Sequence, residues 1–264
     1  NYMNKGYMVI ALAYRGKVSD DLIYLGCILL KDEVRKDAIE GVKLIKSAGV
    51  NLIVVTGDSL DTAMYIGREL DLYKDDDVCL TSSDLSLMSD DELKALANRI
   101  KIVARAKPTD KSRLVRIFKE LNLVVGMTGD GINDAAALKK CDVGFAMGSG
   151  ADVAKEAADI VILDDNICSI SMAILFGRTI FKNIRKFIIF QLTVNICAMS
   201  LSIIGPFIGI STPVTVMQML WINMIMDSLA SLAFAYDNPN KIYMREKPKS
   251  KNEHIINKYM YGEI

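Results

Sequence analysis

An uncharged stretch of 24 residues, Phe187 to Ile210, constrains the fold of this chain more than any other feature. At about 1.5 Å per residue, a helix of this length can cross the roughly 30 Å hydrocarbon core of a bilayer. Proline interrupts the pattern at Pro206 and Pro213, and a second apolar stretch with one charge, Asp227, runs from Val214 to Ala235. We therefore expect an α-helical transmembrane hairpin, with spans at 187–210 and 214–235, and not a pair of soluble core helices.

Basic residues flank this hairpin on both outer sides and are absent from the loop between the spans. They are Arg178, Lys182, Arg185 and Lys186 before it, and Lys241, Arg245, Lys247 and Lys249 after it. By the positive-inside rule, both ends lie in the cytoplasm. We expect residues 169–186 to form a cytoplasmic stalk helix and residues 236–264 a cytoplasmic basic segment.

Upstream of residue 168, apolar runs alternate with helical patterns. Strands are predicted at 52–55, 100–104, 123–127, 143–147 and 160–163, and helices at 38–48, 60–70, 92–98 and 109–120. Such alternation favours an α/β fold with a mainly parallel, doubly wound sheet. Further expectations are buried strands at 6–14 and 22–30, a helix opening at Asp32–Arg35, and surface connections at 74–77 and 81–91.

Composition excludes several classes of function. Lys+Arg and Asp+Glu both total 32, so no global basic surface recommends nucleic acid as a partner. His254 is the only histidine, which argues against a multi-histidine metal site or a histidine-based triad. The five cysteines contain no CxxC pair, which argues against zinc and a disulfide framework.

The sequence Thr-Gly-Asp-Gly-Ile-Asn-Asp at 128–134 follows an apolar run, 121–127, that is predicted to be a buried strand. Ligands of open α/β sheets bind beyond the carboxyl ends of strands. Gly129 and Gly131 allow close approach of the backbone to a ligand. Asp130 and Asp134 offer the hard oxygen ligands that Mg²⁺ prefers. The alternative is an ordinary turn with a helix cap, which the ordered set of seven residues makes less attractive.

Four further motifs accompany this one in a fixed order. They are Thr56-Gly57-Asp58, the segment Lys-Pro-Thr-Asp-Lys at 107–111, Val143–Gly150 and Ala158–Asn166. From about Gly6 to its end the chain thereby resembles P-type cation-transporting ATPases, and in particular plasma-membrane-type (type IIB) calcium pumps. The resemblance implies a haloacid-dehalogenase-like (Rossmannoid) phosphorylation domain at 31–168, preceded by the end of the nucleotide domain at 1–30.

The resemblance also implies roles at a phosphate site that uses Mg²⁺ and ATP. Asp130 would ligate Mg²⁺, while Asp134 and Asn133 would orient the metal site and the phosphoryl group. Lys111, Thr56 and the Gly57 N–H would contact phosphoryl oxygens. Asp58 would support the turn or contact nucleotide, and Arg105 would contact ATP. Without the Lys-Pro-Thr-Asp-Lys context, Lys111 would be read as a solvated lysine on a helix face, and for Arg105 a surface arginine is as good a reading as an ATP contact.

The phosphorylated aspartate of these pumps lies in an Asp-Lys-Thr-Gly-Thr motif, which this sequence lacks. It is therefore expected upstream, in a longer protein of which this chain is a part. The resemblance thus implies an ATP-driven enzyme that exports Ca²⁺ through an aspartyl-phosphate intermediate. Its catalytic domain would be cytoplasmic, in an integral protein of the plasma membrane, the vacuole or another endomembrane. Calmodulin is a further possible partner, through a tail that follows residue 264.

A candidate cation site lies in the predicted spans. An ionisable residue within a span is costly and indicates function, and Asn223 and Asp227 share one helix face at a spacing of four. With Asn195 they supply carboxylate and amide oxygens that suit Ca²⁺. Ala198 and Met226 stand where calcium pumps of the sarcoplasmic-reticulum branch carry a glutamate and a threonine, which implies one Ca²⁺ per cycle.

Three alternatives stay open. The transported ion could be another cation such as Mn²⁺, because oxygen ligands discriminate poorly. The chain could be a haloacid-dehalogenase-like phosphatase joined to a membrane anchor, or an inactive remnant. An anchor alone does not require Asn223 and Asp227 at helical spacing.

Overall fold

The computed structural model describes residues 7–15, 22–31 and 33–256. The chain divides by its internal contacts into two compact units. One comprises the residues up to Ser171 together with Lys247–Lys251, and the other comprises Met172–Glu246 with the residues from Asn252 on.

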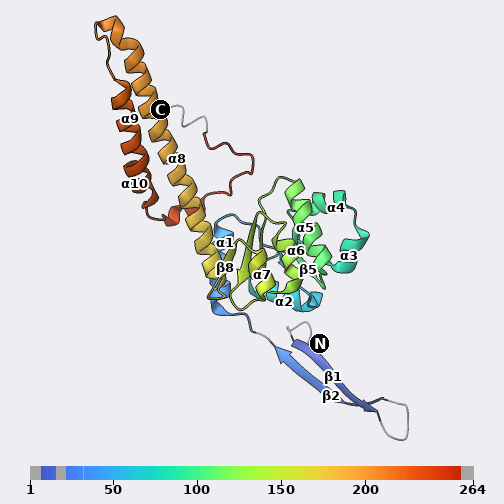
Figure 1. Cartoon of the computed structure of the whole chain (residues 1–264). Coiled ribbons are helices and arrows are strands. Elements are labelled where there is room, and N and C mark those ends of the chain that lie inside the picture. The colour runs from blue at the N-terminus through green and yellow to red at the C-terminus, as the bar shows by residue number, and fades with distance from the viewer. Residues whose placement is uncertain (1–6, 16–21, 32, 257–264) are drawn as a thin grey trace. The chain divides into compact units, whose positions relative to one another are not determined.

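The first unit is an α/β lobe built from two parallel sheets (Figure 1). Its elements are α1 (Lys36–Ser47), β3 (Val54–Val55), α2 (Leu60–Glu69), β4 (Val78–Thr81), α3 (Ser82–Leu87), α4 (Asp90–Leu96), β5 (Ile100–Ala104), α5 (Pro108–Glu120), β6 (Gly126–Gly129), α6 (Ala135–Leu138), β7 (Val143–Met147), α7 (Asp152–Ala157) and β8 (Ile160–Ile162). The strand orders are β3-β5-β4 and β6-β7-β8, and every pair in them is parallel. The predicted α/β class with flanking helices is confirmed, but the strands form two sheets of three and not one. β3 and β6 are each an edge strand.

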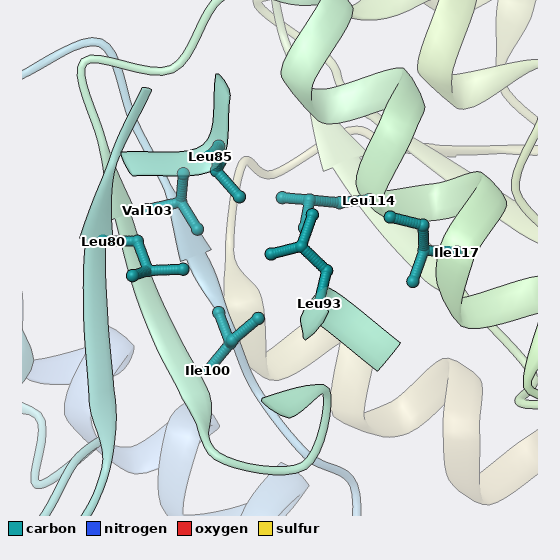
Figure 2. Close-up of a cluster of buried hydrophobic side chains, with 7 residues drawn as sticks. All are labelled: Leu80, Leu85, Leu93, Ile100, Val103, Leu114 and Ile117. Carbon is teal, nitrogen blue, oxygen red and sulfur yellow. The ribbon is translucent and has the colours of Figure 1, made fainter. Parts of the chain in front are cut away.

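Helix α5 links the two sheets. Its Leu114 and Ile117 join a buried apolar cluster with side chains of β4, β5, α3 and α4 (Figure 2). Its Val115 packs with Ala137 on the other side, against residues next to and within β6. Burying a side chain of this size stabilises the fold by about 1.5–3 kcal/mol. The middle of α5 thereby packs against both sheets, through two different faces of the helix.

The two N-terminal strands pair only with each other. β1 (Tyr7–Arg15) and β2 (Leu22–Lys31) form an antiparallel ribbon with a β-bulge after Leu12. The strand prediction is confirmed within the described residues, but the expected burial is wrong, since Tyr14 is 48% exposed and Leu22 67%. A two-stranded ribbon has no second layer to cover its apolar side chains, and the described chain supplies none.

Three local predictions are wrong, because backbone conformation and capping at the helix ends override the sequence pattern. The first helix starts at Lys36 and not at Asp32–Arg35, since Arg35 is extended (φ −62°, ψ 140°); Asp32 itself lies outside the described residues. Capping boxes at Thr81 and Ser89 start α3 and α4 within the supposed surface connection 81–91. After α5, Asn122 takes a left-handed φ of 57° and terminates the helix, so the strand starts at Gly126.

The second unit contains two long apolar helical segments that run side by side (Figure 1). α8 (Ile167–Ile204) leads into a 3-10 turn, Gly205–Ile208. The return segment consists of α9 (Val216–Ile225), a π-helical turn (Met226–Ala230) and α10 (Ser231–Ala235). Both segments are long and apolar enough to cross a membrane, and at most 6% of their most apolar windows is buried within the structure. Core helices of a soluble protein would be covered, so this exposure favours a lipid environment.

Candidate functional site

The loop after β6 holds two carboxylates in different environments. Gly129 is the last residue of β6, and a single 3-10 turn, Ile132–Asp134, leads into α6. Asp130 is exposed, whereas the Asp134 side chain is only 7% exposed. A Cβ atom on Gly129 would lie 2.5 Å from the Asp134 Cβ, so only glycine allows the Asp134 carboxylate to fold back over the strand end.

Lys111 is the partner of this buried carboxylate. Its Nζ lies 2.6 Å from Asp134 Oδ1, and the lysine side chain is 19% exposed. The segment Lys-Pro-Thr-Asp-Lys at 107–111 explains how it gets there. Pro108 occupies the first position of α5, and Asp110 accepts hydrogen bonds from the Lys107 N–H (2.9 Å) and the Ser82 hydroxyl (2.7 Å). With the helix start fixed by these neighbours, Lys111 is directed at the loop after β6.

The turn after β3 is closed by its own side chains. The Thr56 hydroxyl donates to Asp58 Oδ2 (3.0 Å) and accepts from the Asp58 N–H (3.1 Å). The Arg105 and Ala106 N–H groups donate to the Asp58 and Thr56 carbonyls at 2.9 Å, which joins this turn to the loop after β5. Gly57 is exposed, and its N–H has no hydrogen-bond partner within the described residues. This N–H is therefore available to an anion.

Arg105 and Asn133, two further predicted site residues, are both exposed. Arg105 has a left-handed backbone (φ 53°), which is uncommon for a residue with a side chain. No side-chain hydrogen bond or ion pair of either residue occurs in the described part of the chain, so each stays a candidate contact and no more.

A glycine loop after β7 supports Asp130, and sequence reasoning did not assign it this role. A Cβ atom on Gly150 would lie 2.9 Å from the Asp130 carbonyl oxygen, and the Ala151 N–H donates to that oxygen at 2.8 Å. Next to it, the Ser149 N–H donates to Asp165 Oδ1 at 3.2 Å. The only signal in the sequence was the position of Gly-Ser-Gly, 148–150, directly after a predicted strand.

The residues at the loop after β6 fit Mg²⁺ bound together with a phosphate. No group of three or more His, Cys, Asp or Glu side chains gathers anywhere in the described ranges, and the carboxylates of this loop are Asp130 and Asp134. Mg²⁺ usually keeps several water ligands and takes one or two carboxylates plus phosphate oxygens. Lys111 adds a positive charge at the same place. Phosphoryl transfer needs this combination of positioning and charge neutralisation.

In the membrane-type helices, the candidate ligands lie at similar depth. Phe190 of α8 and Phe234 of α10 have ring centroids 5.9 Å apart. At about 1.5 Å per residue, Asn195 lies roughly 8 Å from this contact along α8. Asp227 lies roughly 10 Å from it along the antiparallel return segment, in the same direction. The Asp227 carboxylate has no hydrogen-bond or ion-pair partner among the described residues, and Asp227 lies in the π-helical turn, a feature frequent at functional sites.

Besides the Asn183 oxygen, which lies on α8 ahead of the predicted spans, two amide oxygens of this hairpin are buried without a partner in the described structure. They belong to Asn223, which the sequence predicted as a ligand, and to Gln191, which it did not. A buried amide oxygen without a hydrogen bond is costly and normally meets a donor or a cation. The spacing of four between Gln191 and Asn195 was the available signal.

Comparison with known proteins gives consistent matches. A family model described as haloacid dehalogenase-like hydrolase matches residues 7–142, and one described as cation transporting ATPase, C-terminus, matches residues 211–264. A plasma membrane-type calcium-transporting ATPase 4 of Arabidopsis thaliana is 40% identical over 89% of this chain and 23% of its own length. Calcium-transporting ATPase PAT1 of Dictyostelium discoideum is 36% identical over 100% of this chain and 27% of its own.

Solved structures include proteins of similar fold. One of them is the crystal structure of a zinc-transporting PIB-type ATPase in the E2.Pi state, with a TM-score of 0.59 and 24% identity over 92% of this chain and 32% of that one. The chain thus spans about a quarter of the length of the curated relatives named above.

Proposed function

Since the chain belongs to the haloacid dehalogenase-like hydrolase family, we propose that it is the phosphate-handling and fifth-and-sixth-helix portion of an ATP-driven Ca²⁺ pump of the P type. The observation that carries this proposal is the pairing of Lys111 with Asp134 beside Asp130, in one chain with a membrane-type hairpin that bears Asp227. A phosphatase with a simple anchor needs the first feature but has no use for a carboxylate in a span.

The phosphate chemistry takes place at the carboxyl ends of β3 and β6. A nucleophilic aspartate from the rest of the protein attacks the γ-phosphorus of ATP, and the bond to the ADP oxygen breaks. Water then attacks the phosphorus of the aspartyl phosphate and releases inorganic phosphate. Asp130 and Asp134 would hold Mg²⁺, whose charge neutralises the phosphoryl oxygens. Thr56, the Gly57 N–H and Lys111 position those oxygens, and Asp58 keeps the Thr56 hydroxyl in place.

The nucleophile belongs on a strand between the two sheets. β3 and β6 are both edge strands, and neither has a partner on its outer side among the described residues. Unpaired edges of this kind are normally covered. A parallel strand that pairs with both would bring its carboxyl end between Thr56 and Asp130. The absence of the Asp-Lys-Thr-Gly-Thr motif from this chain agrees with a nucleophile supplied from elsewhere.

The transported ion is one Ca²⁺ per cycle, bound by Asn195, Asn223 and Asp227 together with groups from other helices. Ala198 and Met226 are each only 8% exposed, so apolar side chains pack where a second set of ligands would be needed. The names of the relatives favour Ca²⁺ over Mn²⁺. The protein is integral to a membrane, with the α/β lobe on the cytoplasmic side.

The test is phosphorylation of the full-length protein by labelled ATP, with and without Ca²⁺. Asp130→Asn should form no phosphoenzyme, and Asp227→Asn should lose the Ca²⁺ dependence while still binding nucleotide. Asp152→Asn is the control, because that side chain is 94% exposed and, among the described residues, has only the neighbouring Lys155 as partner. A wild-type phosphoenzyme level in Asp130→Asn would overturn the assigned site, and two Ca²⁺ transported per ATP would overturn the single-ion proposal.

A further inference from the structure

The basic face of α8 holds the segment that follows the second membrane-type helix. This face comprises Arg178, Lys182, Arg185 and Lys186, and we call it, with its partners in residues 237–254, the clamp. From the sequence these charges indicated only which side of the membrane they lie on. In the structure each of them has a specific partner some 50 to 70 positions later in the chain.

The half of the clamp nearer the start of α8 binds a short 3-10 helix, Lys241–Arg245. Arg178 Nη1 donates to the carbonyl oxygens of Tyr243 (2.7 Å) and Glu246 (2.9 Å). Lys182 pairs with the Glu246 carboxylate and lies 4.1 Å from the centre of the Tyr243 ring. Burial lowers the pKa of Arg178, as expected for a guanidinium that is enclosed by its partners.

The other half lies next to the span. Arg185, whose side chain is 14% exposed, donates to Glu253 (2.9 Å) and to the His254 carbonyl oxygen (2.8 Å). Lys186 pairs with Asp237, and the Asn183 amide donates to the Asp237 carbonyl oxygen at 3.4 Å. Asp237 follows the last residue of α10, Ala235, by two positions, so this half fixes the end of α10 itself.

The Lys186–Asp237 pair is almost equidistant from the two candidate ligands. Asn195 lies nine residues beyond Lys186 on α8, and Asp227 lies ten residues before Asp237. At about 1.5 Å per residue these separations are roughly 13.5 and 15 Å, so the pair sets the two side chains at the same depth. A slip by one helical turn would move them about 5.4 Å apart, whereas Ca²⁺–oxygen distances of about 2.3–2.6 Å tolerate far less.

We propose that the clamp is a register lock, in which Lys186 and Asp237 are positioning residues that set the depth of the second helix against the first and so bring Asp227 level with Asn195. This inference rests on the proposed cation site. The same proposal assigns the basic flank to partners within this chain and not to anionic lipid headgroups, because the four charges are already neutralised or hydrogen-bonded there.

The experiment uses the full-length protein in vesicles and measures phosphoenzyme formation against Ca²⁺ concentration. Lys186→Glu and the milder Asp237→Asn should raise the Ca²⁺ needed for half-maximal activation, by about tenfold or more for the charge reversal. The maximal phosphoenzyme level and the KM for ATP should stay unchanged. The exchanged double variant Lys186→Glu/Asp237→Lys should restore Ca²⁺ activation, which also tests whether any loss in the single variant comes from misfolding.

Lys241→Glu is the matched control, since it makes the same charge change as Lys186→Glu but at an exposed lysine of the segment that follows α10. It should have no effect on Ca²⁺ activation. Unchanged Ca²⁺ activation in both Lys186→Glu and Asp237→Asn overturns the lock, and so does a double variant that fails to restore Ca²⁺ activation. An equal shift in Lys241→Glu also overturns it, because that result points to electrostatic interaction with lipid. A wild-type protein without any Ca²⁺-dependent phosphoenzyme refutes the proposed function instead.

Discussion

Replacing Lys111 by methionine tests the local electrostatics of the phosphate site most simply. The change leaves the Asp134 carboxylate, 7% exposed, without its cation. Removing one partner of a buried ion pair costs about 3–5 kcal/mol. Asp134→Asn should cost less, about 1–2 kcal/mol, because the amide oxygen still accepts a hydrogen bond from the Lys111 ammonium. We therefore predict a larger loss of stability for Lys111→Met than for Asp134→Asn.

Amide hydrogen exchange of the chain in detergent is a suitable assay, with protection followed in α5 and α6. Fluorescence is not suitable, because the only tryptophan, Trp221, lies in α9. A loss of 3 kcal/mol also corresponds to a melting temperature lower by roughly 6–12 °C for a domain of this size. Lys119→Met, on the same helix, is the control: its partner Asp142 also binds Lys251, so a loss below about 1 kcal/mol is expected.

Two results would refute this reasoning. One is an equal loss of stability in Lys111→Met and Lys119→Met, which would make the Lys111–Asp134 pair no more than a surface interaction. The other is a larger loss in Asp134→Asn than in Lys111→Met, which would mean that the unpaired ammonium and not the unpaired carboxylate is the costly group.

Three further predictions follow from other contacts. Gly129→Ala should abolish phosphorylation of the full-length protein, since its Cβ has no space, whereas Gly126→Ala, with no atom nearer than 3.6 Å, should not. Arg113→Met should cost about 1–3 kcal/mol in thermal unfolding, because two main-chain carbonyls lose their donor, and Arg116→Met, half-exposed, under about 1 kcal/mol. Burial alone raises the pKa of Asp142, but hydrogen bonds from one backbone N–H and two lysines hold it below its usual value. Its contribution is therefore fully present above about pH 4 and is lost progressively as pH falls through the lowered pKa of the folded state, so replacement by asparagine should destabilise at pH 7 and progressively less as pH falls below about 4.

The elements with strong periodicity could be predicted from sequence. The strands at Ile100–Ala104 and Val143–Met147 and the helix from Leu60 have the predicted positions, because unbroken apolar runs and a clear helical face leave few alternatives. Where short polar residues can cap a helix, as at Thr81 and Ser89, composition alone suggests a loop and the structure has helices.

The site could be predicted in outline only. The motif named Asp130 and Asp134 together, but not that one is exposed and the other paired with Lys111, because that distinction depends on a contact across 23 residues. The same holds for the contact of Gly150 with Asp130 and for the partners of the basic face of α8. Both depend on residues that are far apart in the sequence. Contacts between distant segments decide which charge is buried and which is available, and no local pattern carries that information.

The most direct test of the account is uptake of labelled Ca²⁺ into vesicles that contain the full-length protein, driven by ATP and Mg²⁺. We predict accumulation by the wild type, none by Asp130→Asn because no phosphoenzyme forms, and none by Asp227→Asn although it still binds nucleotide. Uptake by Asp227→Asn at the wild-type rate, or a wild type that hydrolyses ATP without moving Ca²⁺, would contradict the claim that the lobe drives an ion through this hairpin.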